Sequence, residues 1–353
     1  MRFKTQIKNV SVFAKFCASL ASLDQIAWCR LNDEDVQFTV IPDKGSQVWS
    51  NLKIETVFDS YIIQSAAEKN TINLEVPVQA LQRALKSALG ATSVQLRLTK
   101  KDNVPMLSLT IVSNSISSGN GVVAPASSAR ISDEYGDFDF SEDIEGSGFG
   151  DGSVGTTRER ETIITQDVPV KVLAQQTVAH LHEPATPPSD VNIFLPSLGQ
   201  IKSVSERFTK LSLAASKGSS GTSPRLELSA SMHGTFKIAI TTDALSISSK
   251  WTGLTHPELE PSMFENGSQG VRDDPSTRKK ELGGPNGDDP AGWTSVRIDA
   301  KDWGRVLSVG RLNSRVIATF IPDHGLVLYV YLPNEDNPQE ESVLTYYISS
   351  FSA

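Results

Sequence analysis

The chain has 353 residues, of which 39% are hydrophobic and 21% are charged, and its formal net charge is -8. This length is sufficient for two domains with separate cores, and this composition is typical of a soluble globular protein. No apolar stretch approaches the roughly 18 residues that a membrane-spanning helix requires, so we expect no membrane partner.

Two acidic segments rich in Gly and Ser carry most of the negative charge. Residues 113–162 contain ten Asp/Glu and three Arg, and residues 252–292 contain eight Asp/Glu and four Lys/Arg. Neither segment has a sustained apolar period, so neither can bury enough apolar surface to offset its ordering entropy. We therefore expect an N-terminal domain over 1–112, a disordered acidic linker over 113–162, and a C-terminal domain over 163–353 with a disordered insertion at 252–292. The remainder of the chain is mildly basic.

Apolar periodicity predicts the elements of the N-terminal domain in chain order. They are a strand at 2–8, a helix at 10–23, strands at 26–31, 36–41, 48–52, 62–65 and 71–76, a helix opened by Pro77 and ended by Gly90, and strands at 93–99 and 106–112.

The C-terminal domain repeats this order of elements. The predicted elements are a strand at 168–173, a possible short helix at 175–182, a strand at 191–194, a helix opened by Pro196 with Leu211 on its inner face, strands at 225–231, 235–249 and 294–298, a helix at 300–309, and strands at 315–321, 326–331 and 343–350. At a constant offset of 222 residues, Val76 and Leu81 align with Ile298 and Trp303. This agreement favours duplicated units over two unrelated α+β domains.

Basic side chains lie opposite the apolar faces of the predicted helices. They are Lys15, Arg83, Lys86, Lys202, Arg207, Lys210, Lys301 and Arg305. For any single helix, a solvated surface is the ordinary interpretation. Recurrence at equivalent places favours a polyanionic partner, because Lys and Arg can contact phosphates without reading bases, which gives salt-sensitive and sequence-independent binding.

Motifs for enzymatic chemistry are missing from the sequence. It contains no GxxxxGK[ST], CxxC or HExxH pattern, so we expect no ATP hydrolysis, no metal site and no cofactor. The Gly-rich stretch 146–152 and the acids Asp133, Glu134, Asp137 and Asp139 fall in the acidic linker, where we interpret them as solvated loop. Cys17 and Cys29 are predicted to be free buried thiols, which indicates a reducing compartment, the cytosol or the nucleus.

Several segments together resemble the Hus subunit of the nine-one-one DNA-damage checkpoint clamp, a relative of the PCNA sliding clamp. They are MRFKTQI, VWSNL, LEVPVQALQRALKSA, DVPVKVL, SDVNIFLPSLGQIKSVSERF and LTYYISSF. The resemblance implies an α+β fold with two tandem PCNA-like DNA-clamp domains, each of two βαβββ units, with helices lining a ring and sheets outside. The two acidic segments are longer than in the family.

The resemblance also implies partners and a location. It implies a non-enzymatic subunit of a heterotrimeric ring, formed with two paralogous clamp subunits around double-stranded DNA in the nucleus. A clamp loader would place the ring, which would promote checkpoint kinase activation and tether repair enzymes. An adaptor that holds proteins without contacting DNA is the alternative function. An enzyme such as a nuclease would need clustered carboxylates on ordered elements near the basic faces, whereas the acids concentrate in the two acidic segments, which argues against an enzyme.

Partner sites follow from the resemblance as further expectations. Client peptides would dock beside the interdomain connector at Ile163, Ile164, Val168 and Pro169, near the turn Pro42–Ser46. Taken one by one, these residues are better explained as ordinary strand core. Strands ending near Val112 and spanning 225–231 would be the edges that pair with neighbouring subunits.

Overall fold

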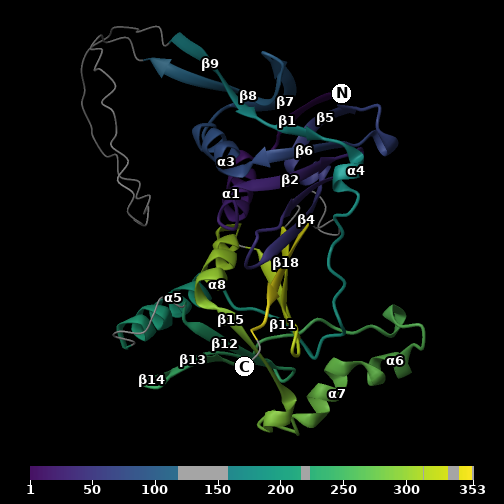
Figure 1. The fold of residues 1–353 in the computed structure, drawn as a ribbon, viewed down its shortest axis with the longest axis vertical. Helices are drawn as coiled ribbons and strands as arrows, with labels where there is room; N and C mark the ends of the chain where they lie inside the picture. The colour runs from purple at the N-terminus through teal and green to yellow at the C-terminus, as the bar shows by residue number, and fades with distance from the viewer. Residues whose placement is uncertain (118–157, 216–222, 313, 333–341, 352–353) are drawn as a thin grey trace, which may run out of the picture.

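A computed structural model describes residues 1–117, 158–215, 223–312, 314–332 and 342–351 (Figure 1). Its helices are α1 (Val10–Ala21), α2 (Ile54–Val57), α3 (Val78–Ser87), α4 (Gln175–Val178), α5 (Leu198–Ala215), α6 (Ser268–Asp273), α7 (Pro275–Leu282) and α8 (Ala300–Val306). Short 3-10 turns are η1 (Glu68–Asn70), η2 (Pro261–Met263), η3 (Pro290–Gly292) and η4 (Leu307–Leu312).

The strands of the N-terminal half are β1 (Arg2–Ile7), β2 (Ile26–Leu31), β3 (Asp35–Val40), β4 (Gln47–Lys53), β5 (Phe58–Gln64), β6 (Ile72–Pro77), β7 (Ser93–Lys101), β8 (Val104–Ser117), β9 (Arg158–Pro169) and β10 (Lys171–Leu173). Those of the C-terminal half are β11 (Val191–Phe194), β12 (Arg225–Ser231), β13 (Thr235–Thr242), β14 (Leu245–Trp251), β15 (Trp293–Asp299), β16 (Arg315–Ile321), β17 (Gly325–Leu332) and β18 (Ser342–Ser349).

The chain contains four βαβββ units, as the resemblance to sliding clamps implies. They are β1-α1-β2-β3-β4, β6-α3-β7-β8-β9, β11-α5-β12-β13-β14 and β15-α8-β16-β17-β18. The strands form three antiparallel sheets in the orders β5-β1-β7-β8-β9, β10-β6-β2-β3-β4-β18-β17-β16-β11 and β14-β13-β12-β15. Val76 and Ile298 occupy equivalent strands before α3 and α8, and both are completely buried.

Buried aromatic residues lie beneath the helices of each half, within one hydrophobic core that spans both halves, in place of the two separate cores expected from the chain length. In the N-terminal half, Phe13 and Phe16 of α1 pack against Phe38 of β3, and Phe13 also contacts Phe58 edge to face. Asn9 begins α1 because its Oδ1 accepts a hydrogen bond from the Val12 amide (2.9 Å). In the C-terminal half, Trp303 of α8 is fully buried.

The two halves are joined by a continuous sheet. Strand β18 from the end of the chain pairs antiparallel with β4, and Val48 lies opposite Tyr346, which is fully buried. The Lys53 amide donates a hydrogen bond to Ser342 Oγ across the junction (3.0 Å). Backbone pairing across the junction gives the two halves a fixed relative position.

The structure differs from the expected acidic linker at both of its ends. Residues 113–117 continue β8 and residues 158–162 begin β9, and the two strands pair from Met106↔Pro169 to Ser117↔Arg158. The central part, 118–157, lies outside the described residues, and so do the Gly-rich stretch and the acids Asp133–Asp139. Strands β9 and β10 belong to the N-terminal sheets, so the connection between the halves is residues 174–190, here named the connector.

The structure also differs from the expectation of a disordered insertion at 252–292. The segment forms α6 and α7 and packs against the C-terminal half: Ser276 is completely buried, and Lys279 Nζ lies 3.1 Å from Asp190 Oδ2. A Cβ atom on Gly292 would lie 2.3 Å from Gly283 Cα, so two backbone segments meet there. The segment buries glycine backbone and polar groups instead of an apolar helix face. Its packing therefore produces no apolar periodicity in the sequence.

Three further local expectations are corrected. The predicted strand 235–249 is a hairpin of β13 and β14, in which Thr242 pairs with Leu245. Leu211, placed on the inner face of α5, is 45% exposed, because the C-terminal turns of α5 extend past the strands they cover (Figure 1). The possible helix at 175–182 is the single turn of α4.

We expect Lys279→Ala to release the insertion from the C-terminal half. The side chains of Lys279 and Asp190 are only 21% and 18% exposed, so removal of the ammonium leaves a partly buried carboxylate without its cation. The free energy of opening for the α7 amides, measured by hydrogen exchange, should fall by about 1–3 kcal/mol. Arg278→Ala is the control, since its pair with Asp273 is exposed (63% and 54%) and should contribute little. Equal effects of the two substitutions would contradict this packing.

Candidate functional site

The helices form a row along one side of the molecule. Figure 1 shows α3, α1, α8 and α5 following one another down the left of the view, with the nine-stranded sheet to their right. Helix α1 packs against α3 and η4, and α5 packs against η4 and α8. We name α3, α1, η4, α8 and α5 the helix row. It crosses the junction between the halves, where Ser22 Oγ lies 2.7 Å from Ser308 Oγ and 3.0 Å from the Arg305 carbonyl oxygen.

The cations predicted from the helical period lie on the outer face of the helix row. The exposed members are Lys15, Arg83, Lys86, Arg207, Lys210 and Lys301, whereas Lys202 and Arg305 are half-buried. On α3, Val78, Leu81, Ala84 and Leu85 are buried on the opposite face. A buried face turned toward the sheet requires the basic face to point away from it.

Two carboxylates on the helix row are already partnered. Lys202 Nζ lies 3.8 Å from Glu206 Oε1, one helical turn along α5. Asp302 of α8 accepts a hydrogen bond from Ser46 Oγ (2.5 Å), so it holds the β3–β4 turn instead of facing outward. The remaining positive charge can contact a polyanion, and Lys and Arg at this spacing suit phosphate oxygens.

The free sheet edges differ from those expected. Val112 lies on β8, which β9 covers, and β12 (Arg225–Ser231) lies between β13 and β15. In the same two sheets, the strands that lie at an edge are β9, beside β8, and β14, beyond β13. Figure 1 shows β9 and β14 at opposite ends of the molecule. The sequence reasoning missed both, because β9 begins within the charged segment and β14 was merged with β13.

The residues expected to dock client peptides do not lie on the connector. Ile163 and Ile164 are exposed on edge strand β9 (63% and 43%), Val168 is 3% exposed and part of the core, and Pro169 ends β9. The turn Pro42–Ser46 lies instead against α8 through Asp302. These four residues are therefore separated from the connector by the β10 pairing and belong to an edge of the N-terminal sheet.

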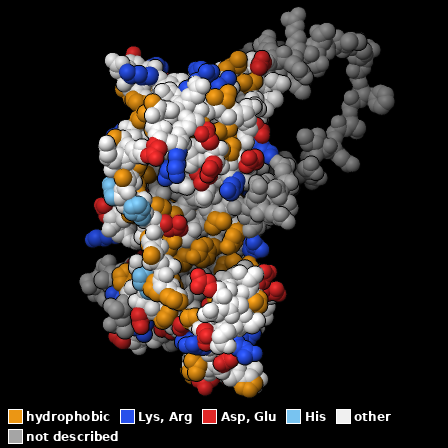
Figure 2. Space-filling model, turned by 90° about the vertical axis from the view of Figure 1, so that its right-hand side faces the viewer, with side chains coloured by type: hydrophobic (Ala, Val, Ile, Leu, Met, Phe, Trp, Pro, Cys, Tyr) orange, Lys and Arg blue, Asp and Glu red, His pale blue; other side chains and the backbone are white. Residues whose placement is uncertain are grey.

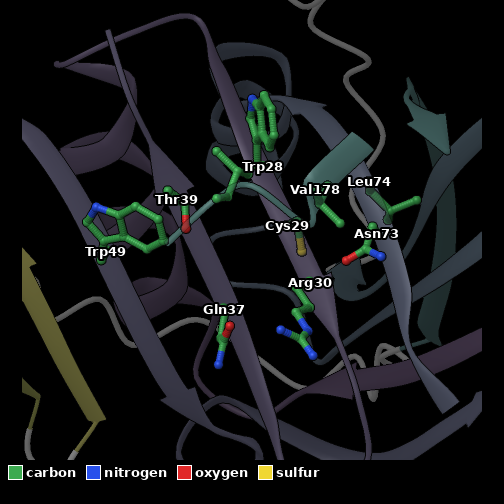
Figure 3. Close-up of a pocket in the computed structure, with 10 residues that line it drawn as sticks. Trp28, Cys29, Arg30, Gln37, Thr39, Trp49, Asn73, Leu74 and Val178 are labelled. Carbon is green, nitrogen blue, oxygen red and sulfur yellow. The ribbon is translucent and has the colours of Figure 1, made fainter. Parts of the chain in front are cut away.

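The connector crosses the outer face of the nine-stranded sheet and covers a groove. Val178 and Leu181 of the connector face Trp28, Thr39 and Trp49 of the sheet, and Figure 3 shows Thr39 between the two indoles. The groove continues past His182 and Glu183 to Val343 and Thr345. We name it the connector groove. Figure 2 views this side of the molecule and shows hydrophobic side chains gathered at its narrow middle.

The floor of the connector groove is part of a cross-strand row that spans both halves. The register places Trp28, Thr39, Trp49, Thr345, Tyr329, Ile317 and Phe194 opposite one another in turn. Sequence reasoning missed this row, because the partners come from strands whose register is set by long-range pairing. The sequence did carry one indication of this row, because large aromatic residues stand at strand positions that face away from the core.

Specific contacts hold the connector over this floor. Tyr347 Oη donates a hydrogen bond to Glu183 Oε1 (2.9 Å), and the His180 ring meets Trp28 edge to face at 6.3 Å. Partial burial, reinforced by the Glu183 carboxylate, raises the pKa of Tyr347. The phenol therefore stays protonated and keeps donating to Glu183.

Other chemistry is sparse in the part of the chain that the structure describes. There, no group of three or more His, Cys, Asp or Glu is arranged to hold a metal ion, and no helix is long and apolar enough to cross a membrane. Cys17 and Cys29 are free and buried, as predicted, and burial raises the pKa of both thiols. His180 and His182 are exposed on the connector.

Comparisons with known proteins agree with this architecture. Two PCNA crystal structures, from Entamoeba histolytica and Thermococcus kodakaraensis, both superpose with a TM-score of 0.57 at 11% and 13% identity. Each comparison covers 99% of this chain and 99% or 100% of the other. At this identity the likeness establishes the fold, two tandem PCNA-like clamp domains.

Sequence relatives are checkpoint proteins. The chain is 34% identical to the checkpoint protein hus1 of Schizosaccharomyces pombe over 352 residues, 99% of both chains. It is 24% identical to human checkpoint protein HUS1 over 267 residues, 73% of this chain and 76% of the human one. The family model described as "Hus1-like protein" matches residues 1–352. Since this match spans almost the whole chain, the protein belongs to the Hus1-like family of checkpoint clamp proteins.

Proposed function

We propose that this chain is one subunit of a closed heterotrimeric ring that encircles double-stranded DNA in the nucleus. The observation that carries the proposal is the helix row, whose outer face presents cations from both halves on one side of the molecule. Contacts from Lys and Arg to phosphates are independent of sequence, which suits a subunit that must move along DNA. A closed ring needs only modest charge, because its topology prevents dissociation.

Two of the sheet edges, β9 and β14, support assembly into a ring. Strands β9 and β14 expose unpaired backbone groups at opposite ends of the molecule, so a neighbour can extend either sheet by strand pairing. Head-to-tail contacts of this kind close into a ring when the rotation between subunits permits. The relatives named above are checkpoint proteins, and we take the neighbours to be two paralogous clamp subunits.

The proposed role in the checkpoint follows from a ring that encircles DNA. A dedicated clamp loader places the ring at damaged DNA, and the ring then promotes checkpoint kinase activation and holds repair enzymes. The subunit acts as a scaffold, not as an enzyme. The connector groove is the docking site we propose for client proteins, since its indoles and half-buried aliphatic residues offer apolar pockets beside backbone and hydroxyl groups.

Ring assembly is tested by co-expressing the chain with two clamp paralogues and imaging the purified particle by electron microscopy. We expect closed rings with the unaltered chain. Ile164→Glu should reduce ring formation at least several-fold, because it places a charge on edge strand β9. Ile62→Glu is the matched control: Ile62 has the same 43% exposure and lies on β5, the other edge of the same sheet. Rings that form equally well with both variants would contradict the proposed edge.

An adaptor that holds proteins without touching DNA is the second function, and the connector groove favours it. Such an adaptor would have the same clamp fold and form the same ring. The two functions differ only in whether the helix row contacts DNA.

A further inference from the structure

A second groove lies on the outer face of the sheet β14-β13-β12-β15, away from the helix row. Its floor consists of Lys237, Lys250 and serine side chains, and the insertion supplies one wall through residues 287–290. Trp293, at the start of β15, supplies the other wall. We name it the lysine groove. It is distinct from the connector groove, which lies on the nine-stranded sheet.

The lysine pair is unfavourable without an anion. Lys237 and Lys250 are directly opposite in the β13–β14 register, which brings their Cβ atoms to about 5 Å apart, and like charges in such a pair destabilise a sheet. Within the described ranges, neither lysine has a carboxylate oxygen within ion-pair distance. Glu227, which also lines the groove, is paired with Arg297 (3.6 Å). The uncompensated charge therefore belongs to the two lysines.

Hydroxyl groups and an oriented indole complete the groove. The register continues from Lys237 to Ser229 and then to Ser295, whose Oγ donates a hydrogen bond to Ser229 Oγ (2.8 Å). Trp293 Nε1 donates to the Gly287 carbonyl oxygen (3.1 Å), which fixes the ring, and Lys250 Nζ lies 5.6 Å from the indole centroid. Donors thus line the floor, and a flat apolar surface stands beside them.

The charges decide the class of ligand. A phosphoserine or phosphothreonine carries about -1.5 to -2 at neutral pH, which matches two adjacent ammonium groups better than the single charge of a carboxylate. Asp288, on the insertion wall, disfavours a run of negative charges such as a nucleic acid backbone. We propose that the lysine groove binds a phosphorylated segment of a partner protein, with its phosphate on Lys237 and Lys250 and a neighbouring residue against Trp293.

The test uses the full chain and a fluorescent alanine-rich peptide with a central phosphoserine, measured by anisotropy. Lys237→Gln/Lys250→Gln should weaken binding at least about tenfold, because it removes two charge-assisted hydrogen bonds to the phosphate. The matched control is Lys4→Gln/Arg97→Gln, which removes a like-charged cross-strand pair from the N-terminal sheet. It should leave binding unchanged.

Three further arms give decisive results. Peptides with serine or glutamate at the central position should bind much more weakly, and equal binding of the glutamate peptide would overturn the assignment to phosphate. Inorganic phosphate should compete only at much higher concentration than the peptide. If inorganic phosphate competed at the same concentration as the peptide, the groove would be a site for free anions, and the proposal of a phosphorylated protein segment would be wrong. Because the isolated chain is used without DNA, the outcome is independent of whether the chain forms a ring.

Discussion

Replacement of Trp303 with alanine is expected to lower the free energy of unfolding of the C-terminal half by about 3–5 kcal/mol. The indole is fully buried at the contact between α8 and α5, and its Nε1 donates to Ser205 Oγ (3.1 Å). The substitution removes a large apolar side chain and leaves Ser205 without its donor. Denaturant unfolding followed by the remaining tryptophan fluorescence would measure the change.

Two control variants separate packing from hydrogen bonding at Trp303. Ser205→Ala removes only the acceptor and should cost about 1–3 kcal/mol. Trp303→Phe keeps much of the apolar volume and should be less destabilising than Trp303→Ala. If Trp303→Ala cost less than Ser205→Ala, the interface between α5 and α8 would not be close-packed, and the positions of Lys202, Lys301 and Arg305 would need revision.

Neutralising four cations of the helix row is expected to weaken the hold of the assembled ring on DNA. The variant combines Lys202→Gln, Arg207→Gln, Lys301→Gln and Arg305→Gln. Removal of one cation from a phosphate reduces the slope of log affinity against log salt by roughly 0.9, so the slope should become shallower by up to about 3.6 for the four substitutions. Affinity for a short duplex at moderate salt should fall by about 10- to 100-fold.

Assembly should be unaffected by these substitutions, because they lie on helices and not on β9 or β14. Size-exclusion chromatography checks this before anisotropy on duplex DNA over a salt series. A control ring carries Arg2→Gln, Lys69→Gln, Lys100→Gln and Arg272→Gln, which remove the same charge from exposed positions away from the helix row and from both grooves. Unchanged DNA affinity and salt slope in the first variant would favour the adaptor without DNA contact over the clamp.

The sequence by itself determined most of the elements outside the two acidic segments and most of their buried faces. Strands β2, β11, β12 and β16 have the bounds that alternation predicted, and the helical period placed Lys15, Arg83 and Lys301 opposite buried residues. These features are local: each depends on which residues within a few turns or strand positions can face a core. The internal repeat that aligns Val76 with Ile298 could be recognised in the sequence for the same reason.

Only the tertiary structure decided the sheet edges, the packing of 252–292 and the two grooves. Strand β9 was hidden because its charged start offers no apolar alternation, and its backbone is stabilised by pairing with distant β8. Residues 252–292 are held by Lys279–Asp190 and by the approach of Gly292 to Gly283, interactions between positions that no local period connects. The aromatic row and the Lys237–Lys250 pair exist only once strand register is set, and register depends on interactions across the whole sheet.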